Sequence, residues 1–208
     1  MKIVVIGGGP AGLMAAEAVS TRGALVEVYD AMASMGRKFL LAGKGGLNLT
    51  HSEPMEKFLS RYGHRRAYIQ PLLDRFGPDA LCRWAYGLGV QTFVGTSGRI
   101  FPSDLKSAPL LRAWLRRLRQ SGVMFHVRHR WGGWDEAGTL RFVTPSGDRL
   151  VSADAVVLAL GGGSWPRFGS DGAWVRLLEV CSVPVQPLRP ANCGFDGSSR
   201  RDFCLRVA

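Results

Sequence analysis

Three glycines and one aspartate near the N-terminus have the types and spacing needed to hold a dinucleotide. Residues 7–12 form a G-x-G-x-x-G sequence, and Asp30 follows its last glycine by 18 residues. The first glycine allows a sharp turn, the second lets a pyrophosphate approach the backbone, and the third lets a helix pack closely on a strand. The carboxylate can accept hydrogen bonds from ribose hydroxyls. The segment predicts an ADP-binding site formed by Gly7, Gly9, Pro10, Ala11, Gly12 and Asp30.

The elements around these residues make the pattern specific. Residues 2–6 are a short β-branched run that is typical of a buried parallel strand, residues 11–19 have helical spacing, and residues 26–30 alternate like a second strand. Strand, glycine loop, helix, strand and acid therefore occur in order. They predict an α/β, Rossmann-like domain with a central parallel sheet. The pattern leaves FAD and NAD open, because both carry the same ADP half.

Three later segments are expected to complete this domain. Residues 122–131 predict another strand of the central sheet, residues 132–151 a β-meander, and residues 155–160 a buried parallel strand that ends in Gly161, Gly162 and Gly163. Ligands bind at the carboxyl ends of such strands. The candidates to line a substrate pocket there are Ser164, Arg167, Ser170 and Asp171.

The middle of the chain has the periodicity of helices. Residues 54–88 predict helical structure with breaks near Gly63 and near Gly77–Pro78, and residues 107–120 predict a further helix. The apolar side chains expected to face a core in the first stretch are Leu72, Leu73, Phe76, Leu81 and Trp84.

A second glycine-rich segment carries the resemblance to a known family. Residues 36–51 hold four glycines and three cations, an arrangement that can present several backbone N–H groups to an anion. Together with residues 7–12, 98–102, 160–166 and 169–172, this segment resembles the bacterial FAD/NAD(P)-dependent flavoproteins of the aminoacetone-oxidase-like and bile-acid-reductase-like group. The chain is most similar to a proteobacterial subfamily of that group.

The resemblance implies an oxidoreductase that passes electrons between a small organic substrate and FAD, in a fold of the two-dinucleotide-binding-domain type. Arg37 and Lys38 would lie along the ADP half, and the loop with Gly45, Asn48 and Thr50 would approach the isoalloxazine ring. The backbone near Trp131 would contact adenine, and Gly161 and Gly162 would allow close approach to FAD. No catalytic side chain is predicted, because a flavin itself carries the hydride. The alternatives are an NAD-binding dehydrogenase domain and a non-catalytic or RNA-associated flavin domain.

The same resemblance bears on domain organisation. Residues 1–190 are expected to form an incomplete FAD-binding domain, and residues 191–208 a linker or the start of a substrate-side domain. Relatives in the group are about twice this length, so the chain looks truncated.

Composition excludes several classes of protein. Hydrophobic residues make up 46% of the 208, which indicates a globular protein. No run of residues suits a membrane span. The four cysteines lack C-x-x-C spacing, which argues against a zinc site and fits a reducing bacterial cytoplasm. No metal site is predicted.

The formal net charge of +11 raises the question of an anionic partner. In the predicted helix of residues 107–120, arginines lie on one face while Trp114 belongs to the apolar face, so exposed aromatic rings do not alternate with the cations. We expect at most weak, non-specific binding of nucleic acid. The expected partner is a small-molecule substrate, with NAD(P)H as a candidate, and no membrane.

Overall fold

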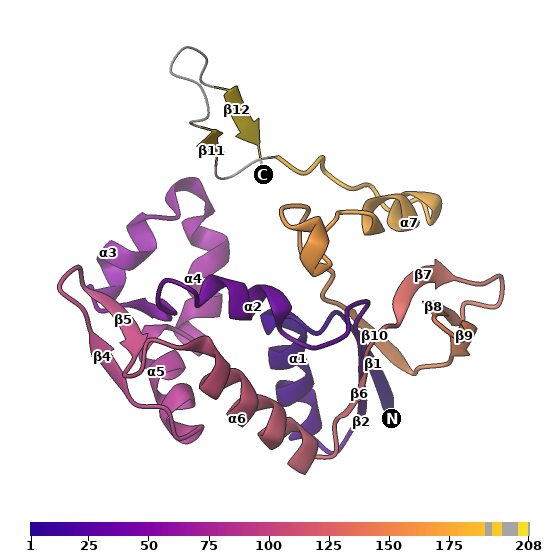
Figure 1. Ribbon diagram of the computed structural model, residues 1–208, viewed down its shortest axis with the longest axis horizontal. Helices are drawn as coiled ribbons and strands as arrows, with labels where there is room; N and C mark the ends of the chain where they lie inside the picture. The colour runs from indigo at the N-terminus through magenta and orange to yellow at the C-terminus, as the bar shows by residue number, and fades with distance from the viewer. Residues whose placement is uncertain (190–192, 197–203, 208) are drawn as a thin grey trace. The chain divides into compact units, whose positions relative to one another are not determined.

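The computed structural model describes residues 1–189, 193–196 and 204–207. Its four-stranded parallel β-sheet combines two strands near the N-terminus with two strands from later in the chain. Its strands are β1 (Lys2–Ile6), β2 (Leu25–Tyr29), β6 (Met124–His126) and β10 (Ala155–Leu158), in the order β10-β1-β2-β6. Helix α1 (Pro10–Ser20) joins β1 to β2 and buries Gly12, Leu13 and Ala16 (Figure 1). The predicted Rossmann-like α/β fold is confirmed.

The chain divides into two compact units, which are described separately here. The first comprises residues 1–38 and 121–208, and the second comprises residues 39–120. The division falls inside the predicted domain of residues 1–190, and that domain boundary stays a prediction. Residues 190–192, 197–203 and 208, which include most of the predicted linker, lie outside the described residues.

The predicted β-meander is present in the first unit. It consists of β7 (Arg130–Trp134), β8 (Leu140–Thr144) and β9 (Gly147–Val151), paired antiparallel in that order. Its apolar residues form one core with the parallel sheet, in which the Tyr29 and Phe142 rings stack with centroids 4.3 Å apart. The chain continues through η2 (Pro166–Phe168), α7 (Trp174–Val180) and a hairpin of β11 (Cys193–Asp196) and β12 (Cys204–Val207).

Two predictions about these strands are wrong. Residues 122–131 form no single strand, because Arg128 has a left-handed backbone (φ 58°) that separates β6 from β7, and the two strands belong to different sheets. The strand β10 is not buried as predicted. It lies at the edge of the sheet, where Ala155 and Leu158 are exposed.

The second unit combines a small antiparallel sheet with helices. The sheet has the order β3 (Thr50–His51), β5 (Arg99–Pro102), β4 (Thr92–Val94). The helices are α3 (Met55–Ser60), η1 (Gly63–Arg65), α4 (Arg66–Arg75), α5 (Pro78–Gly87) and α6 (Ser107–Gln120), and α2 (Arg37–Ala42) starts in the first unit. Its core contains Leu47, Ala85 and Leu110, and the rings of Trp84 and Trp114 meet edge to face at 4.7 Å.

The helical prediction for residues 54–88 is confirmed, including the breaks near Gly63 and Gly77. The predicted core face is wrong in part, since Leu72 and Phe76 are 62% and 39% exposed. The segment of residues 36–51 also differs from the expected loop, because it begins with the short helix α2 before the chain turns through its glycines.

Candidate nucleotide-binding site

In the glycine loop after β1, Gly7, Gly8 and Gly12 pack closely on their neighbours and Gly9 faces open space. Gly7 has a φ of +112° and donates its N–H to the carbonyl of Tyr29 at 2.8 Å. A Cβ on Gly12 would lie 1.8 Å from the carbonyl oxygen of Gly7, so only glycine fits there. A Cβ on Gly9 would meet none of the described residues within 4 Å. The loop therefore leaves free space beside the Gly9 backbone.

The N-terminus of α1 opens onto the same loop. The helix starts at Pro10 after Gly9, and within the described part of the chain no side chain caps it. The first N–H groups of a helix lack partners inside the helix and attract anions. This end of α1 can therefore receive a phosphate group.

Asp30 connects the loop to the end of β2. One carboxylate oxygen accepts the N–H of Gly8 and the other accepts the N–H of Met32, both at 2.7 Å. Burial raises the pKa of Asp30, while the two backbone hydrogen bonds and the charges of Arg37 and Arg130 oppose that shift. A carboxylate has about four lone-pair positions, so Asp30 can still accept a ribose hydroxyl.

A cavity of about 300 Å³ lies at the carboxyl ends of β1 and β2, entirely within the first unit. This volume is at the lower end of the range for ligand pockets and suits one nucleotide moiety. The lining residues used below are Gly7, Asp30, Arg130, Trp131, Asp171 and Trp174.

Two indole N–H groups in the cavity wall lack acceptors. The Nε1 atoms of Trp131 and Trp174 are buried and have no hydrogen-bond partner among the described residues. A buried donor left unpaired costs about 1–3 kcal/mol. Both residues line the cavity, so their rings can pack against a ligand there. Trp174 was not among the predicted site residues, although it follows the predicted pocket segment directly.

An ion pair lies at the cavity wall. Arg130 Nη1 is 2.9 Å from Asp171 Oδ2. Burial raises the pKa of Asp171, but the N–H of Ala173 and the guanidinium of Arg130 outweigh it, and the pKa is lowered. The structure thus places Asp171, a predicted pocket residue, beside the predicted adenine-contacting segment.

Lys38 brings together two further predicted pocket residues. Its Nζ donates to Ser164 Oγ at 3.1 Å and to Ser170 Oγ at 3.0 Å, and Ser170 Oγ donates to the carbonyl of Gly162 at 2.9 Å. These contacts tie the segment after β2 to the loop after β10. Arg167 is exposed, and the guanidinium of Arg37 lies 5.8 Å from the Phe168 ring centroid.

The predicted isoalloxazine loop lies in the second unit. Gly45 and Asn48 are exposed, and Thr50 pairs with Ile100 in the small sheet.

Among the residues that the structure describes, no three His, Cys, Asp or Glu side chains cluster in a way that could hold a metal ion. None of the described helices has both the length and the apolar character required to span a bilayer.

The parallel strands, the glycine turn, the open helix terminus and the acid at the end of β2 are the features of a Rossmann domain. Comparison with protein families agrees. The chain belongs to the family described as the HI0933-like protein Rossmann domain, which matches residues 1–194.

Two curated relatives share this region. One from Haemophilus influenzae is 24% identical over 196 residues, which cover 92% of this chain and 48% of the relative. One from Escherichia coli is 25% identical and covers 92% of this chain and 47% of the relative. Both are named ribosomal RNA dihydrouridine synthase. The chain therefore spans about half the length of the curated relatives it matches.

Solved structures share the fold at low identity. A flavocytochrome c3 fumarate reductase matches with a TM-score of 0.62 and 18% identity, over 78% of this chain and 34% of that one. The 3-ketosteroid-Δ4-(5α)-dehydrogenase of Rhodococcus jostii RHA1 matches with a TM-score of 0.59 and 16% identity, over 85% and 53% of the two chains.

Proposed function

We propose that this chain binds FAD and forms the cofactor-binding part of an oxidoreductase. The observation that carries the proposal is the cavity at the ends of β1 and β2, which Gly7 and Asp30 line, together with the open space at the Gly9 backbone. The family assignment supports it, as does the similarity of the fold to a flavocytochrome and a steroid dehydrogenase.

Each part of the site has a role toward the ADP half of FAD. The Gly9 backbone and the N-terminus of α1 would receive the pyrophosphate, and Asp30 would accept the ribose hydroxyls. The rings of Trp131 and Trp174, which line the cavity, would pack against adenine. When bound, FAD supplies the hydride chemistry, so the residues of this chain serve to bind and orient it.

For the substrate of this oxidoreductase we favour a base in RNA over a free small molecule. Both curated relatives are named for the formation of dihydrouridine in ribosomal RNA. Residues 39–120 of this chain hold 13 Lys and Arg against 5 Asp and Glu, a net charge of +8 out of +11. Dihydrouridine forms from uridine when a hydride and a proton add across the C5=C6 bond. The electron pair would come through FAD from a nicotinamide dinucleotide.

Cofactor binding can be tested with the Gly9→Val variant. The added side chain enters open space, so we expect thermal stability close to wild type but FAD affinity at least about tenfold weaker, because the side chain occupies the approach of the pyrophosphate. Titration with FAD and with NAD, followed by the visible flavin absorbance and by tryptophan fluorescence, measures both ligands.

Ala18→Val is the matched control, because Ala18 is exposed on α1 away from its N-terminus. This variant should bind FAD like wild type. Binding of NAD without FAD would favour the dehydrogenase alternative. Wild-type protein that binds neither, or a Gly9→Val variant that binds FAD normally, would overturn the proposal.

A further inference from the structure

Helix α4 carries an exposed aromatic and apolar stripe. The structure describes α4 in full, and each of its residues is exposed or half-buried. Tyr68, Leu72 and Phe76 follow one another at intervals of four and are 71%, 62% and 39% exposed. Residues at this spacing share one face of a helix. The stripe is therefore a continuous surface in contact with solvent.

Two arginines flank the stripe without ion pairs. Arg65, at the start of α4, places its guanidinium 6.0 Å from the centroid of the Tyr68 ring. Arg75 lies three residues after Leu72 and so projects from the same side of the helix. Neither has a salt bridge to any described residue, whereas Arg61 and Arg66 are paired with Glu53 and Glu56. Two positive charges thus remain available beside exposed rings.

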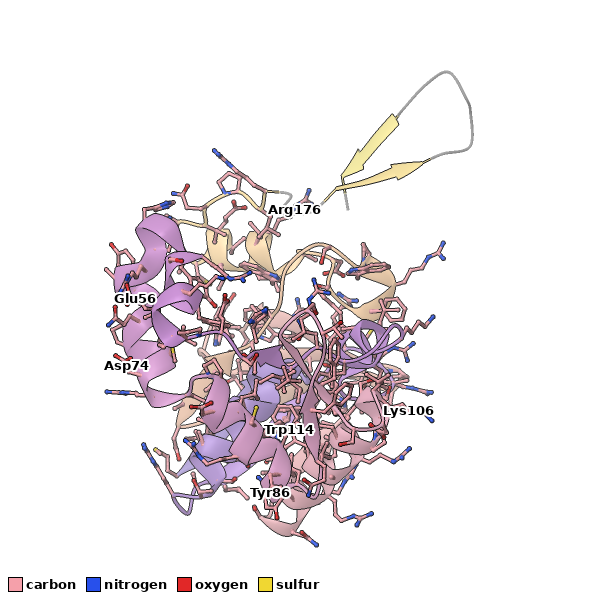
Figure 2. All side chains as sticks on the ribbon, turned by 90° about the vertical axis from the view of Figure 1, so that its left-hand side faces the viewer. Glu56, Asp74, Tyr86, Lys106, Trp114 and Arg176 are labelled. Atoms are coloured by element: carbon pink, nitrogen blue, oxygen red, sulfur yellow. The ribbon has the colours of Figure 1, made fainter. Side chains whose placement is uncertain are left out.

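The acidic side chains of this region do not neutralise that face. Figure 2 labels Glu56 on α3 and Asp74 on α4. Glu56 is held by Arg66 at 2.6 Å. Asp74 is two residues from both Leu72 and Phe76, which places it on the other side of the helix. With the net charge of +8 on residues 39–120, this surface favours a polyanion over an acidic or neutral partner.

We propose that the α4 face, formed by Arg65, Tyr68, Leu72, Arg75 and Phe76, binds single-stranded RNA. Proteins that bind single strands combine aromatic rings, on which bases stack, with cations that meet the phosphates. The α4 face offers both on one helix and the two residues that cap it, Arg65 and Phe76. The inference rests on the RNA substrate proposed above and names a surface that would hold part of that RNA.

The other basic helix lacks one of these two features. On α6, Arg112 and Arg116 are exposed, but Trp114 is only 2% exposed and packs against Trp84 and Phe39. In Figure 2 the Trp114 label lies among surrounding side chains. The α6 surface can attract phosphates but cannot stack bases, so it provides a matched control with the same charge.

The test measures binding of a fluorescein-labelled 20-nucleotide poly(U) RNA by anisotropy over a range of salt concentrations. The variants are Tyr68→Ala, Arg65→Gln/Arg75→Gln and the control Arg112→Gln/Arg116→Gln. We expect Tyr68→Ala to weaken binding roughly 5- to 100-fold at every salt concentration and to leave the salt dependence unchanged. The Arg65/Arg75 variant should reduce the log–log salt slope by about 1.4, since each phosphate contact on a single strand contributes about 0.7.

The control variant distinguishes specific RNA binding by the α4 face from general electrostatic attraction of RNA to basic side chains. The Arg112/Arg116 variant should retain affinity within about threefold of wild type. Equal losses in the two double variants, or full binding by Tyr68→Ala, would overturn the proposal. So would a wild-type protein that does not bind this RNA at low salt. If Tyr68→Ala changes the self-association measured by light scattering and not RNA binding, the face is a protein interface and the proposal is wrong.

FAD binding on the same preparations distinguishes this inference from the proposed function. If the wild-type protein binds FAD normally but the α4 variants leave RNA binding unchanged, only the proposal about the α4 face is rejected. RNA binding through the α4 face by a protein that binds no FAD would reject the flavin proposal alone.

Discussion

Asp30 shows how far residue types predicted the site. Its position at the end of the second strand, 18 residues after the glycine motif, follows from the spacing. Its hydrogen bonds to Gly8 and Met32 do not, because they depend on how two loops fold back on the carboxylate. The same limit applies to Trp174 and Arg130, whose residue types indicate no particular role until the structure shows the cavity that they line.

Replacement of Asp30 by Asn should therefore destabilise the protein even without a ligand. An asparagine can accept with its oxygen from only one of the two N–H groups, and its amide would face the other as a second donor. We expect a loss of about 1–3 kcal/mol in the free energy of unfolding, the usual cost of an unsatisfied buried group. Urea denaturation of the ligand-free protein measures it.

The control is Asp74→Asn, which makes the same chemical change on the surface of α4. It should alter the free energy of unfolding by less than about 0.5 kcal/mol, as for surface substitutions in general. Equal effects of the two substitutions would show that the two backbone hydrogen bonds of Asp30 contribute no stability.

At the level of elements, sequence patterns predicted which residues share a face and not what covers that face. The β-branched run, the glycine stop and the helical spacing of residues 2–30 predicted β1, α1 and β2 correctly. The spacing of Leu72 and Phe76 was equally regular, yet these residues face solvent on α4. Periodicity reports the geometry of a helix, whereas burial depends on its neighbours in space.

The break between β6 and β7 is a second case, and it gives a prediction. Arg128 adopts φ 58°, a conformation that costs a residue with a side chain about 1–2 kcal/mol and that β-branched residues rarely reach. Arg128→Val should lower the melting temperature, whereas Arg128→Gly should keep it at or above the wild-type value. Differential scanning calorimetry compares the two.

Arg149→Val is the control, because Arg149 lies in the regular strand β9 and is exposed. Valine suits strands, so this change should cost less than Arg128→Val. A smaller effect of Arg128→Val would contradict the assignment of strain to residue 128.

For the whole molecule, the pH dependence of folding should reflect a charged cluster that spans the parallel sheet. Glu27 on β2 is 7% exposed, and its carboxylate lies 3.0 Å from Lys2 Nζ on β1 and 3.1 Å from His126 Nε2 on β6. Tyr29 donates its hydroxyl to the same carboxylate. Arg149 on β9 and His129 also act on His126.

Both titrations in this cluster favour the folded protein at neutral pH. Burial raises the pKa of Glu27, but its hydrogen bonds with Tyr29 and Lys2 lower it overall, so its stabilising contribution is lost as the pH falls through that lowered pKa. Burial lowers the pKa of His126, and Glu27 only partly restores it. Protonation of His126 below about pH 6.5 therefore favours the unfolded chain.

We expect the melting temperature to fall between pH 7.5 and pH 5.5, with a smaller fall in a His126→Gln variant. The exposed His64, changed to Gln, is the control and should keep the wild-type profile. A His126→Gln profile parallel to wild type would show that His126 does not contribute to the acid sensitivity.

The division into two units is the feature of the whole molecule that could not be predicted from the sequence. The chain passes from one unit to the other at residues 38–39, inside α2, and at residues 120–121, where α6 ends, so neither crossing lies in an extended linker. The Rossmann pattern of residues 2–30 was recognisable because it is local. The later strands of the same sheet are separated from it by residues 39–120, and no local pattern records which strands they join.

Strands that are neighbours in the parallel sheet are far apart in the sequence, so they are synthesised at different times. β1 is made first, but Ile3 pairs with Ala155 and Glu27 pairs with Met124, so both outer partners emerge from the ribosome long after β1 and β2. At roughly 5–20 residues per second, roughly 6 to 26 seconds pass between the synthesis of β2 and that of β10. The strands β3, β4 and β5 of the second unit pair with one another and have all been made by then. During that interval the apolar strands β1 and β2 are the part of the nascent chain most in need of a chaperone.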